Sequence, residues 1–156
     1  MKIWISLALI LFSTYAQAKD LQPSTPFDAV QHFLYAGDGT ARLDGGVAIN
    51  DENGAIRTCG AEPVILIPMT GYGMEFAAML VTKSDNDSIT GDHDFLMLIR
   101  RSRCDVSGNF AFTRLPPGNW IVVARVSGAK MWATRSYLST NMGDEHVVLG
   151  NEDLSR

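Results

Sequence analysis

The sequence predicts an all-β fold, a β-sandwich of about seven short strands with Greek-key connections. Apolar or alternating segments recur from Gly39 onward, and tight-turn signals separate them, such as Asn-Gly at 53–54 and the segment Asp105–Gly108. Regularly spaced short strands and turns are typical of sandwiches. No repeat or low-complexity linker interrupts the 156 residues, so we expect one domain.

Residues 1–18 have the pattern of a cleavable signal peptide. Lys2 supplies the positive start, Ile3–Phe12 the apolar stretch, and Ala16 and Ala18 the small residues before the cleavage point. The alternative is a membrane anchor, but the apolar stretch is about half the ~20 residues that a bilayer span needs. We therefore expect cleavage after Ala18 and export, to the periplasm first and to the cell surface or the medium second.

The segment 19–37 predicts a short helix that packs on the edge of the domain. Thr25 can cap its free N–H groups, and Pro26 suits its first position. Gly37 is a typical residue after a helix end. Four apolar residues share the predicted packing face: Phe27, Val30, Phe33 and Leu34.

From residue 38, the first half of the sandwich contains two strands and a helical insertion. Thr40–Ile49 has strand-forming ends around Gly45-Gly46, which predicts a bulge or bend. Val64–Ile67 is apolar on both faces, as a central strand is. Gly71–Leu80 has apolar residues at helical spacing and predicts a short helix or an ordered loop.

The second half begins with the polar segment Ser84–Asp94, which predicts an exposed loop. The apolar segment Phe95–Arg101 predicts a strand, and the basic run Arg100–Arg103 is expected at its end, with alternate residues in solvent. A type I turn follows at Asp105–Gly108, and a type II turn is expected at Pro117-Gly118. The strand after it places Trp120 in the core. Two more strands and a polar tail complete the chain: Met131–Ser139, Glu145–Leu149 and residues 151–156.

This stretch carries one continuous pattern of turns and core positions: Asp105-x-x-Gly108-x-Phe110-x-Phe112-x-x-Leu115-Pro116-x-Gly118-x-Trp120-x-Val122. The pattern resembles the carboxypeptidase regulatory-like domains of exported bacterial proteins. The resemblance covers residues 38–150 and implies a transthyretin-like (prealbumin-like) β-sandwich. Because the pattern consists of turn and core positions, it implies a fold and no activity.

The charge of the chain excludes two classes of binding partner. The formal net charge is −4 and no Lys/Arg cluster exists beyond Arg100–Arg103, which argues against nucleic acid and anionic membranes. No residue pattern points to a cofactor, and we expect none.

In an oxidising compartment the isolated pair Cys59 and Cys104 predicts a disulfide. The alternative, a metal or redox pair, lacks C-x-x-C spacing and a nearby histidine.

The three histidines, His32, His93 and His146, are expected as solvated surface residues. An alternative is a small periplasmic hydrolase that uses His93 with its neighbours Asp92 and Asp94. No G-x-S-x-G elbow supports that enzyme, and adjacent side chains cannot all point inward.

The acidic segment Ser84–Asp94 is also a weak candidate for calcium. Its carboxylates could supply the several oxygen ligands that calcium takes: Asp85, Asp87, Asp92 and Asp94. The spacing of an EF-hand loop is not met, so a solvated loop is favoured over a calcium-stabilised structural module.

Aromatic residues outside the core are the remaining candidates for a ligand surface, because their faces stack on sugars or anchor partner proteins. The candidates are Tyr72, Trp132 and Tyr137. With no assembled active site in the sequence, we expect a non-catalytic, exported accessory or binding module of the bacterial cell envelope, with protein or carbohydrate as its ligand.

Overall fold

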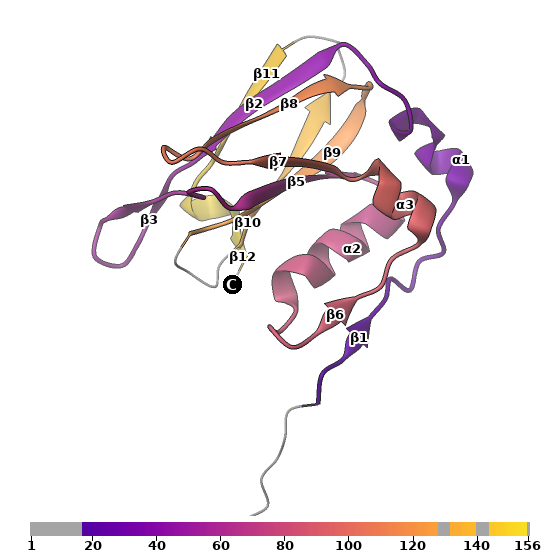
Figure 1. Cartoon of the computed structure of the whole chain (residues 1–156), viewed down its shortest axis with the longest axis horizontal. Coiled ribbons are helices and arrows are strands. Elements are labelled where there is room, and N and C mark those ends of the chain that lie inside the picture. Colours follow the sequence, from indigo (N-terminus) through magenta and orange to yellow (C-terminus); the bar gives the residue numbers. More distant parts are fainter. Residues whose placement is uncertain (1–16, 128–131, 140–143, 156) are drawn as a thin grey trace, which may run out of the picture.

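A computed structural model describes residues 17–127, 132–139 and 144–155 (Figure 1). The predicted β-sandwich is confirmed, with a five-stranded sheet in the order β12-β10-β9-β5-β7 and a three-stranded sheet in the order β11-β2-β8. Most of the predicted signal peptide, residues 1–16, lies outside the described residues. None of the described helices is long and apolar enough to span a bilayer.

The larger sheet consists of β5 (Pro63–Pro68), β7 (Arg100–Arg103), β9 (Gly118–Arg125), β10 (Trp132–Ser139) and β12 (Leu154–Ser155). The smaller sheet consists of β2 (Ala41–Val47), β8 (Asn109–Leu115) and β11 (Asp144–Leu149). Two short pairs join β1 (Asp20–Leu21) to β6 (Ser88–Ile89), and β3 (Ile49–Asn50) to β4 (Ile56–Arg57). The helices are α1 (Ala29–His32), α2 (Gly71–Thr82) and α3 (His93–Leu98), with 3-10 turns at Phe33–Tyr35 and Asn151–Asp153.

The larger sheet is the middle of three layers, with the smaller sheet on one side and α2 and α3 on the other (Figure 1). Alternate residues of β9 therefore enter different cores: Trp120 and Val122 face the smaller sheet, and Val123 faces the helices. Burial on both faces explains why β5 and β9 are apolar almost throughout. The expected central strand at Val64–Ile67 and the core position of Trp120 are both confirmed.

The predicted strand at Phe95–Arg101 is wrong in its first half, which forms α3. The Asp92 side chain caps this helix by accepting hydrogen bonds from the backbone N–H groups of Asp94 (2.9 Å) and Phe95 (3.4 Å). Phe95 and Leu98 then lie one helical turn apart and are both buried. A short apolar run does not distinguish a buried helix from a strand. The strand begins only at Arg100, where residues alternate between half-buried and exposed as expected.

The predicted helix at 19–37 exists but begins later and packs by another face. Asp28, not Thr25, caps it, by accepting from the N–H of Val30 at 2.9 Å. The residues that enter the core are His32 and Tyr35. His32 is held between the carbonyl of Asp28 (2.6 Å) and the hydroxyl of Thr70 (2.7 Å), so its expected place on the surface is wrong.

Two glycines have a different role from the one predicted. Gly118 does not have the positive φ that a type II turn requires. A Cβ there would lie 2.7 Å from the Tyr35 ring, so Gly118 allows that ring to pack on β9. Gly45 lies under the Phe110 ring, and the irregularity of β2 falls between Ala41 and Leu43 instead of at Gly45.

Candidate functional site

The N-terminal segment forms a shallow polar hollow against α2 and the residues before α3. The hollow has a volume of about 240 Å³, and we call it the Tyr72 hollow. Its lining comes from residues 22–27 and from three residues of the domain: Tyr72, Gly91 and Asp92. The N-terminal segment runs past α3 and α2 before it reaches the sandwich (Figure 1).

A single carboxylate fastens the wall of the hollow. Glu75 of α2 accepts hydrogen bonds from the backbone N–H groups of Ser24 (2.6 Å) and Thr25 (3.1 Å). It also accepts from their hydroxyls, at 3.0 Å and 2.7 Å. These hydrogen bonds lower the pKa of Glu75 from 4.5 to about 2, and the bond from the Thr25 hydroxyl has the largest effect. The hydroxyl of Thr25, expected to cap the first helix, is therefore used to hold the loop.

Tyr72 joins the two sides of the hollow but does not expose its ring face. Its hydroxyl accepts a hydrogen bond from the Asp92 N–H at 2.7 Å. The ring packs edge-on against Phe27 and Phe95, with centroids 5.8 Å and 4.7 Å away, and the residue is only 5% exposed. The expectation of Tyr72 as an open stacking surface is therefore wrong, although the residue lines the hollow.

The hollow offers mainly neutral hydrogen-bonding groups. The exposed Gln22 and Ser24 contribute an amide and a hydroxyl, and Asp92 contributes a carboxylate. Phe27 is half-buried and supplies an apolar patch beside them. Sequence reasoning named Tyr72 and Asp92 but not the site, because residues 25–27 of its N-terminal wall were expected to begin a helix.

The other two predicted aromatic ligand residues lie in β10. Trp132 pairs with Arg125 of β9, and Tyr137 pairs with Trp120. Their side chains lie outside the described part of the structure, so their role in a ligand surface stays a prediction.

The four predicted calcium ligands are engaged locally. Asp92 caps α3, and Asp94 lies 3.3 Å from His93. Asp87 accepts from the backbone N–H groups of Lys19 and Ser84 at 2.9 Å and 3.0 Å, and Asp85 has contacts of its own. Among the described residues, no three acidic, histidine or cysteine side chains gather in a way that could hold a metal ion.

His93, the centre of the alternative hydrolase, lies in solvent. Its side chain is 88% exposed, and the Asp94 side chain beside it is 79% exposed. A catalytic histidine needs a nucleophile and an orienting group that converge on it. The described residues do not provide this arrangement around His93, and His146 is also exposed.

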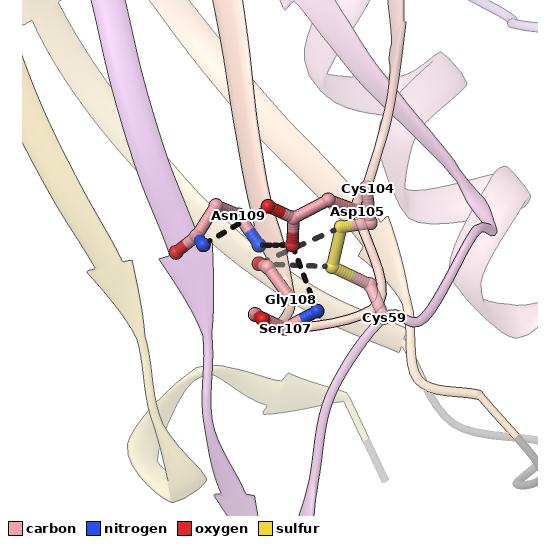
Figure 2. Close-up of a disulfide and its surroundings, with 6 residues drawn as sticks. All are labelled: Cys59, Cys104, Asp105, Ser107, Gly108 and Asn109. Atoms are coloured by element: carbon pink, nitrogen blue, oxygen red, sulfur yellow. Dashed lines mark hydrogen bonds between the residues drawn. A yellow bond between two sulfur atoms is a disulfide. The ribbon is translucent and has the colours of Figure 1, made fainter.

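Cys59 and Cys104 form the expected disulfide, with their Cα atoms 5.8 Å apart (Figure 2). The turn after Cys104 is closed by Asp105, which accepts hydrogen bonds from the N–H groups of Ser107 (2.9 Å) and Asn109 (2.8 Å). These bonds, chiefly the one from the Asn109 N–H, lower the pKa of Asp105. Gly108 has a φ of 91°, as this turn requires. The bridge ties the chain before β5 to the residue directly after β7, where the turn toward β8 begins.

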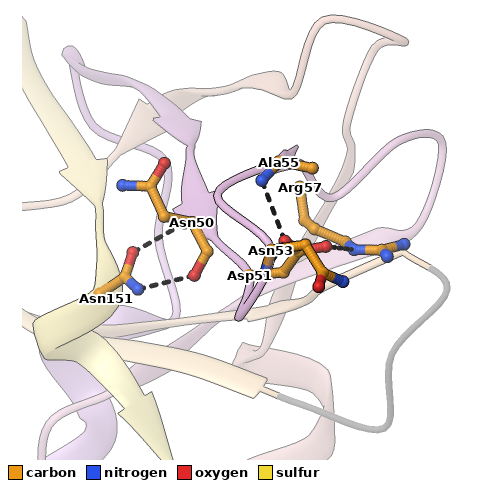
Figure 3. A network of polar contacts seen from close by, with 6 residues as sticks. All are labelled: Asn50, Asp51, Asn53, Ala55, Arg57 and Asn151. Atoms are coloured by element: carbon orange, nitrogen blue, oxygen red, sulfur yellow. Dashed lines mark hydrogen bonds and ion pairs between the residues drawn. The ribbon is translucent and has the colours of Figure 1, made fainter.

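The β3–β4 hairpin is a second tightly closed turn (Figure 3). Its strand β3 lies at the far end of the sandwich from α1 (Figure 1). Asp51 accepts from the N–H groups of Asn53 and Ala55 at 2.9 Å and from Arg57 Nε at 3.0 Å. Asn50 and Asn151 exchange two hydrogen bonds of 2.8 Å, which attach the hairpin to the C-terminal segment. These contacts organise the fold at this end of the sandwich.

Of the four residues of the predicted packing face, only Phe27 packs against the core, and the other three are exposed. Val30, Phe33 and Leu34 are 83%, 77% and 69% exposed, since His32 and Tyr35 take the inward positions. Three adjacent, exposed apolar side chains are a feature of surfaces that contact other molecules.

One comparison with known structures supports the fold. No family model matches the chain, and no curated protein matches it. A solved structure of a candidate carbohydrate-binding protein from Pseudomonas aeruginosa is similar over 84% of this chain and 99% of its own, with a TM-score of 0.61 and 20% identity. The two chains share a fold. A DUF3823 family protein from Parabacteroides merdae also matches, with a TM-score of 0.40 and 17% identity over 72% of this chain and 46% of its own. Membership of the carboxypeptidase regulatory-like family stays a prediction.

Proposed function

We propose that this chain is a non-catalytic carbohydrate-binding module of the bacterial cell envelope. The Tyr72 hollow carries the proposal, because it gathers an amide, a hydroxyl and a carboxylate beside the apolar edge of Phe27. Sugars present hydroxyls around an apolar ring face, so they need polar groups and an apolar surface together. The fold shared with the Pseudomonas protein supports the same ligand class.

The size of the hollow suits a small part of a glycan. At about 240 Å³ it falls just below the ~300–1,000 Å³ typical of small-molecule pockets. We therefore expect a single sugar unit to bind, weakly, as in a module that gains strength from repeated contacts along a polymer.

Titration with a panel of neutral and acidic sugars, followed by NMR chemical shifts, tests the proposal. We expect saturable shifts confined to residues 22–27, Tyr72 and the start of α3. Asp92→Asn keeps a capping oxygen but removes the charge, and it should weaken binding about tenfold, the loss of roughly 1.4 kcal/mol.

Glu52→Gln is the matched control, because Glu52 is exposed on the β3–β4 hairpin and changes charge by the same amount. It should leave the affinity unchanged. Shifts that are absent for every sugar, or that cluster on another face, would overturn the assignment of the hollow.

Export is part of the proposal and has independent support. A buried disulfide forms and persists in oxidising compartments. Mass spectrometry of the protein from a bacterial envelope fraction should show a chain without residues 1–18 and without free thiols. An intact precursor in the cytoplasm would contradict it.

A protein ligand is the second candidate, favoured by the exposed face of Val30, Phe33 and Leu34. Phe33→Ser separates the two candidates. It should leave sugar binding unchanged and abolish any protein contact made by this face.

A further inference from the structure

The backbone nitrogen of Lys19 meets a carboxylate. It donates a hydrogen bond of 2.9 Å to Oδ1 of Asp87. Lys19 is also the residue that would become the N-terminus after the predicted cleavage. Its carbonyl accepts from the Ser88 N–H at 2.9 Å, and β1 begins one residue later, parallel to β6.

We propose that Asp87 is the binding site for the new N-terminus, and that cleavage turns its hydrogen bond into an ion pair. The inference rests on the export proposed above. Hydrolysis of the Ala18–Lys19 peptide bond adds one water, leaving a carboxylate on Ala18 and an amine on Lys19. The amine takes up a proton at neutral pH, since an α-amino group has a pKa of about 7.7–8.0.

The carboxylate is already oriented for this contact. Oδ2 of Asp87 accepts from the Ser84 N–H at 3.0 Å, which leaves Oδ1 directed at Lys19. The backbone N–H of Lys19 lowers the pKa of Asp87 most, and the backbone N–H of Ser84 lowers it further. Lys83 fixes the same turn by donating from Nζ to the Asp87 carbonyl at 2.9 Å.

The next residue, Asp20, is also held by hydrogen bonds. Asp20 accepts from the hydroxyls of Ser88 and Thr90, each at 2.8 Å. Beside Lys19 lies a hollow of about 330 Å³ lined by Gln17, Ser84, Asn86 and Asp87. Loss of Gln17 on cleavage removes one wall and leaves room for the two additional N–H donors of an ammonium group. Maturation would therefore strengthen the attachment of the N-terminal segment that also forms the Tyr72 hollow.

A thermodynamic cycle tests the ion pair. One chain begins at Lys19 and another at Gln17, and each is made with Asp87 and with Asp87→Asn. All elements of the described fold lie after Lys19, so both chains retain them. We expect Asp87→Asn to lower Tm about 3 °C more in the chain that begins at Lys19, a shift of the size that one surface ion pair produces in a domain of this length.

Asp85→Asn is the control for charge in the same turn, and its effect on Tm should be equal in both chains. NMR titration of the α-amino group provides a second readout. Its pKa in the chain beginning at Lys19 should be higher with Asp87 than with Asn. Equal Tm effects of Asp87→Asn in the two chains, or an unchanged amine pKa, would overturn the proposal.

Two further measurements separate this inference from the proposed export and from the proposed binding of glycans. N-terminal sequencing of exported protein checks the cleavage position, and a start at another residue removes the ion pair from the natural protein. Sugar titration of the same variants checks ligand binding. Loss of sugar binding in all of them would count against the glycan proposal while the cycle still reports on Asp87.

Discussion

At the scale of single residues, Glu75 and His32 hold the N-terminal segment to the domain from two sides. Glu75 binds Ser24 and Thr25 from α2, and His32 of α1 bonds to Thr70, directly before α2. Both contacts join residues that are 38 to 51 positions apart in the chain. The shape of the Tyr72 hollow therefore depends on two polar side chains.

Glu75 makes the attachment of this segment sensitive to pH. Its pKa falls from 4.5 to about 2 on folding, so its stabilising contribution is present above 4.5 and is lost as the pH falls toward 2. Glu75→Gln should lower Tm at neutral pH, and its difference from the natural protein should close over that range. Tm measured against pH for both proteins checks this. A difference that stays constant down to pH 2 would contradict it, and Glu52→Gln serves as the control.

Because His32 is buried and Phe33 is exposed, substitutions at these two positions should differ strongly in their effect on the free energy of unfolding. His32→Ala removes a buried ring and leaves the Thr70 hydroxyl without this partner, at a cost of about 2–4 kcal/mol. Phe33→Ser changes a side chain in solvent and should stay within about 0.5 kcal/mol. Urea denaturation of both variants measures the two free energies of unfolding. The helix face inferred here would be wrong if the larger loss came from Phe33.

At the scale of elements, β2 lies so close to its neighbours β8 and β11 in the smaller sheet that one of its residues must be glycine. A Cβ at Gly45 would lie 2.7 Å from the Val147 carbonyl of β11 and closer still to the Phe110 ring of β8. Gly46, the next residue, has no neighbour within 3.5 Å of such a Cβ; the nearest is the Asn109 side chain at 3.6 Å. The two adjacent glycines thus have unlike surroundings.

Alanine at each glycine tests this difference. Gly45→Ala must displace β8 or β11 and should destabilise the protein by about 1–3 kcal/mol. Gly46→Ala should be neutral or slightly stabilising, because it reduces the entropy of the unfolded chain. Denaturant midpoints of the two variants make the comparison. Equal losses at both positions would show that backbone freedom, and not the Phe110 ring, requires glycine here.

Elements also show where sequence patterns are ambiguous. The segment Phe95–Leu98 has the composition of a buried strand, yet it forms a helix because Asp92 caps it and α2 offers an apolar face. Spacing alone predicted a short helix or an ordered loop at Gly71–Leu80, and the structure has the helix, which extends to Thr82. The longer segment shows its period over three turns, whereas the shorter one has too few residues to do so.

At the scale of the whole molecule, the Cys59–Cys104 bridge joins the residues that precede β5 and follow β7, two neighbouring strands of the larger sheet. It closes a loop across 45 positions. Replacement of both cysteines by alanine should cost about 4 kcal/mol, chiefly through the greater freedom of the unfolded chain in the chain-entropy model. Guanidinium denaturation checks the value, and reductant should affect the natural protein but not the variant. An unchanged midpoint after full reduction would contradict this prediction.

Much of the overall architecture could be predicted from the sequence. The sandwich class, the central strand at Val64–Ile67, the turn at Asp105–Gly108 and the cysteine pair all follow from residues that are neighbours in the chain or from simple counting. Alternation, turn chemistry and cysteine number are local properties, and the fold preserves them.

The candidate site was decided by tertiary structure alone. Which face of α1 is buried depends on His32 meeting Thr70, and the Tyr72 hollow exists because Glu75 binds a loop about 50 residues earlier. The sequence determined the sandwich and its turns, since these arise from local periodicity. Only folding determined the hollow and the contact of Lys19 with Asp87, since each needs side chains that come together through packing of distant segments.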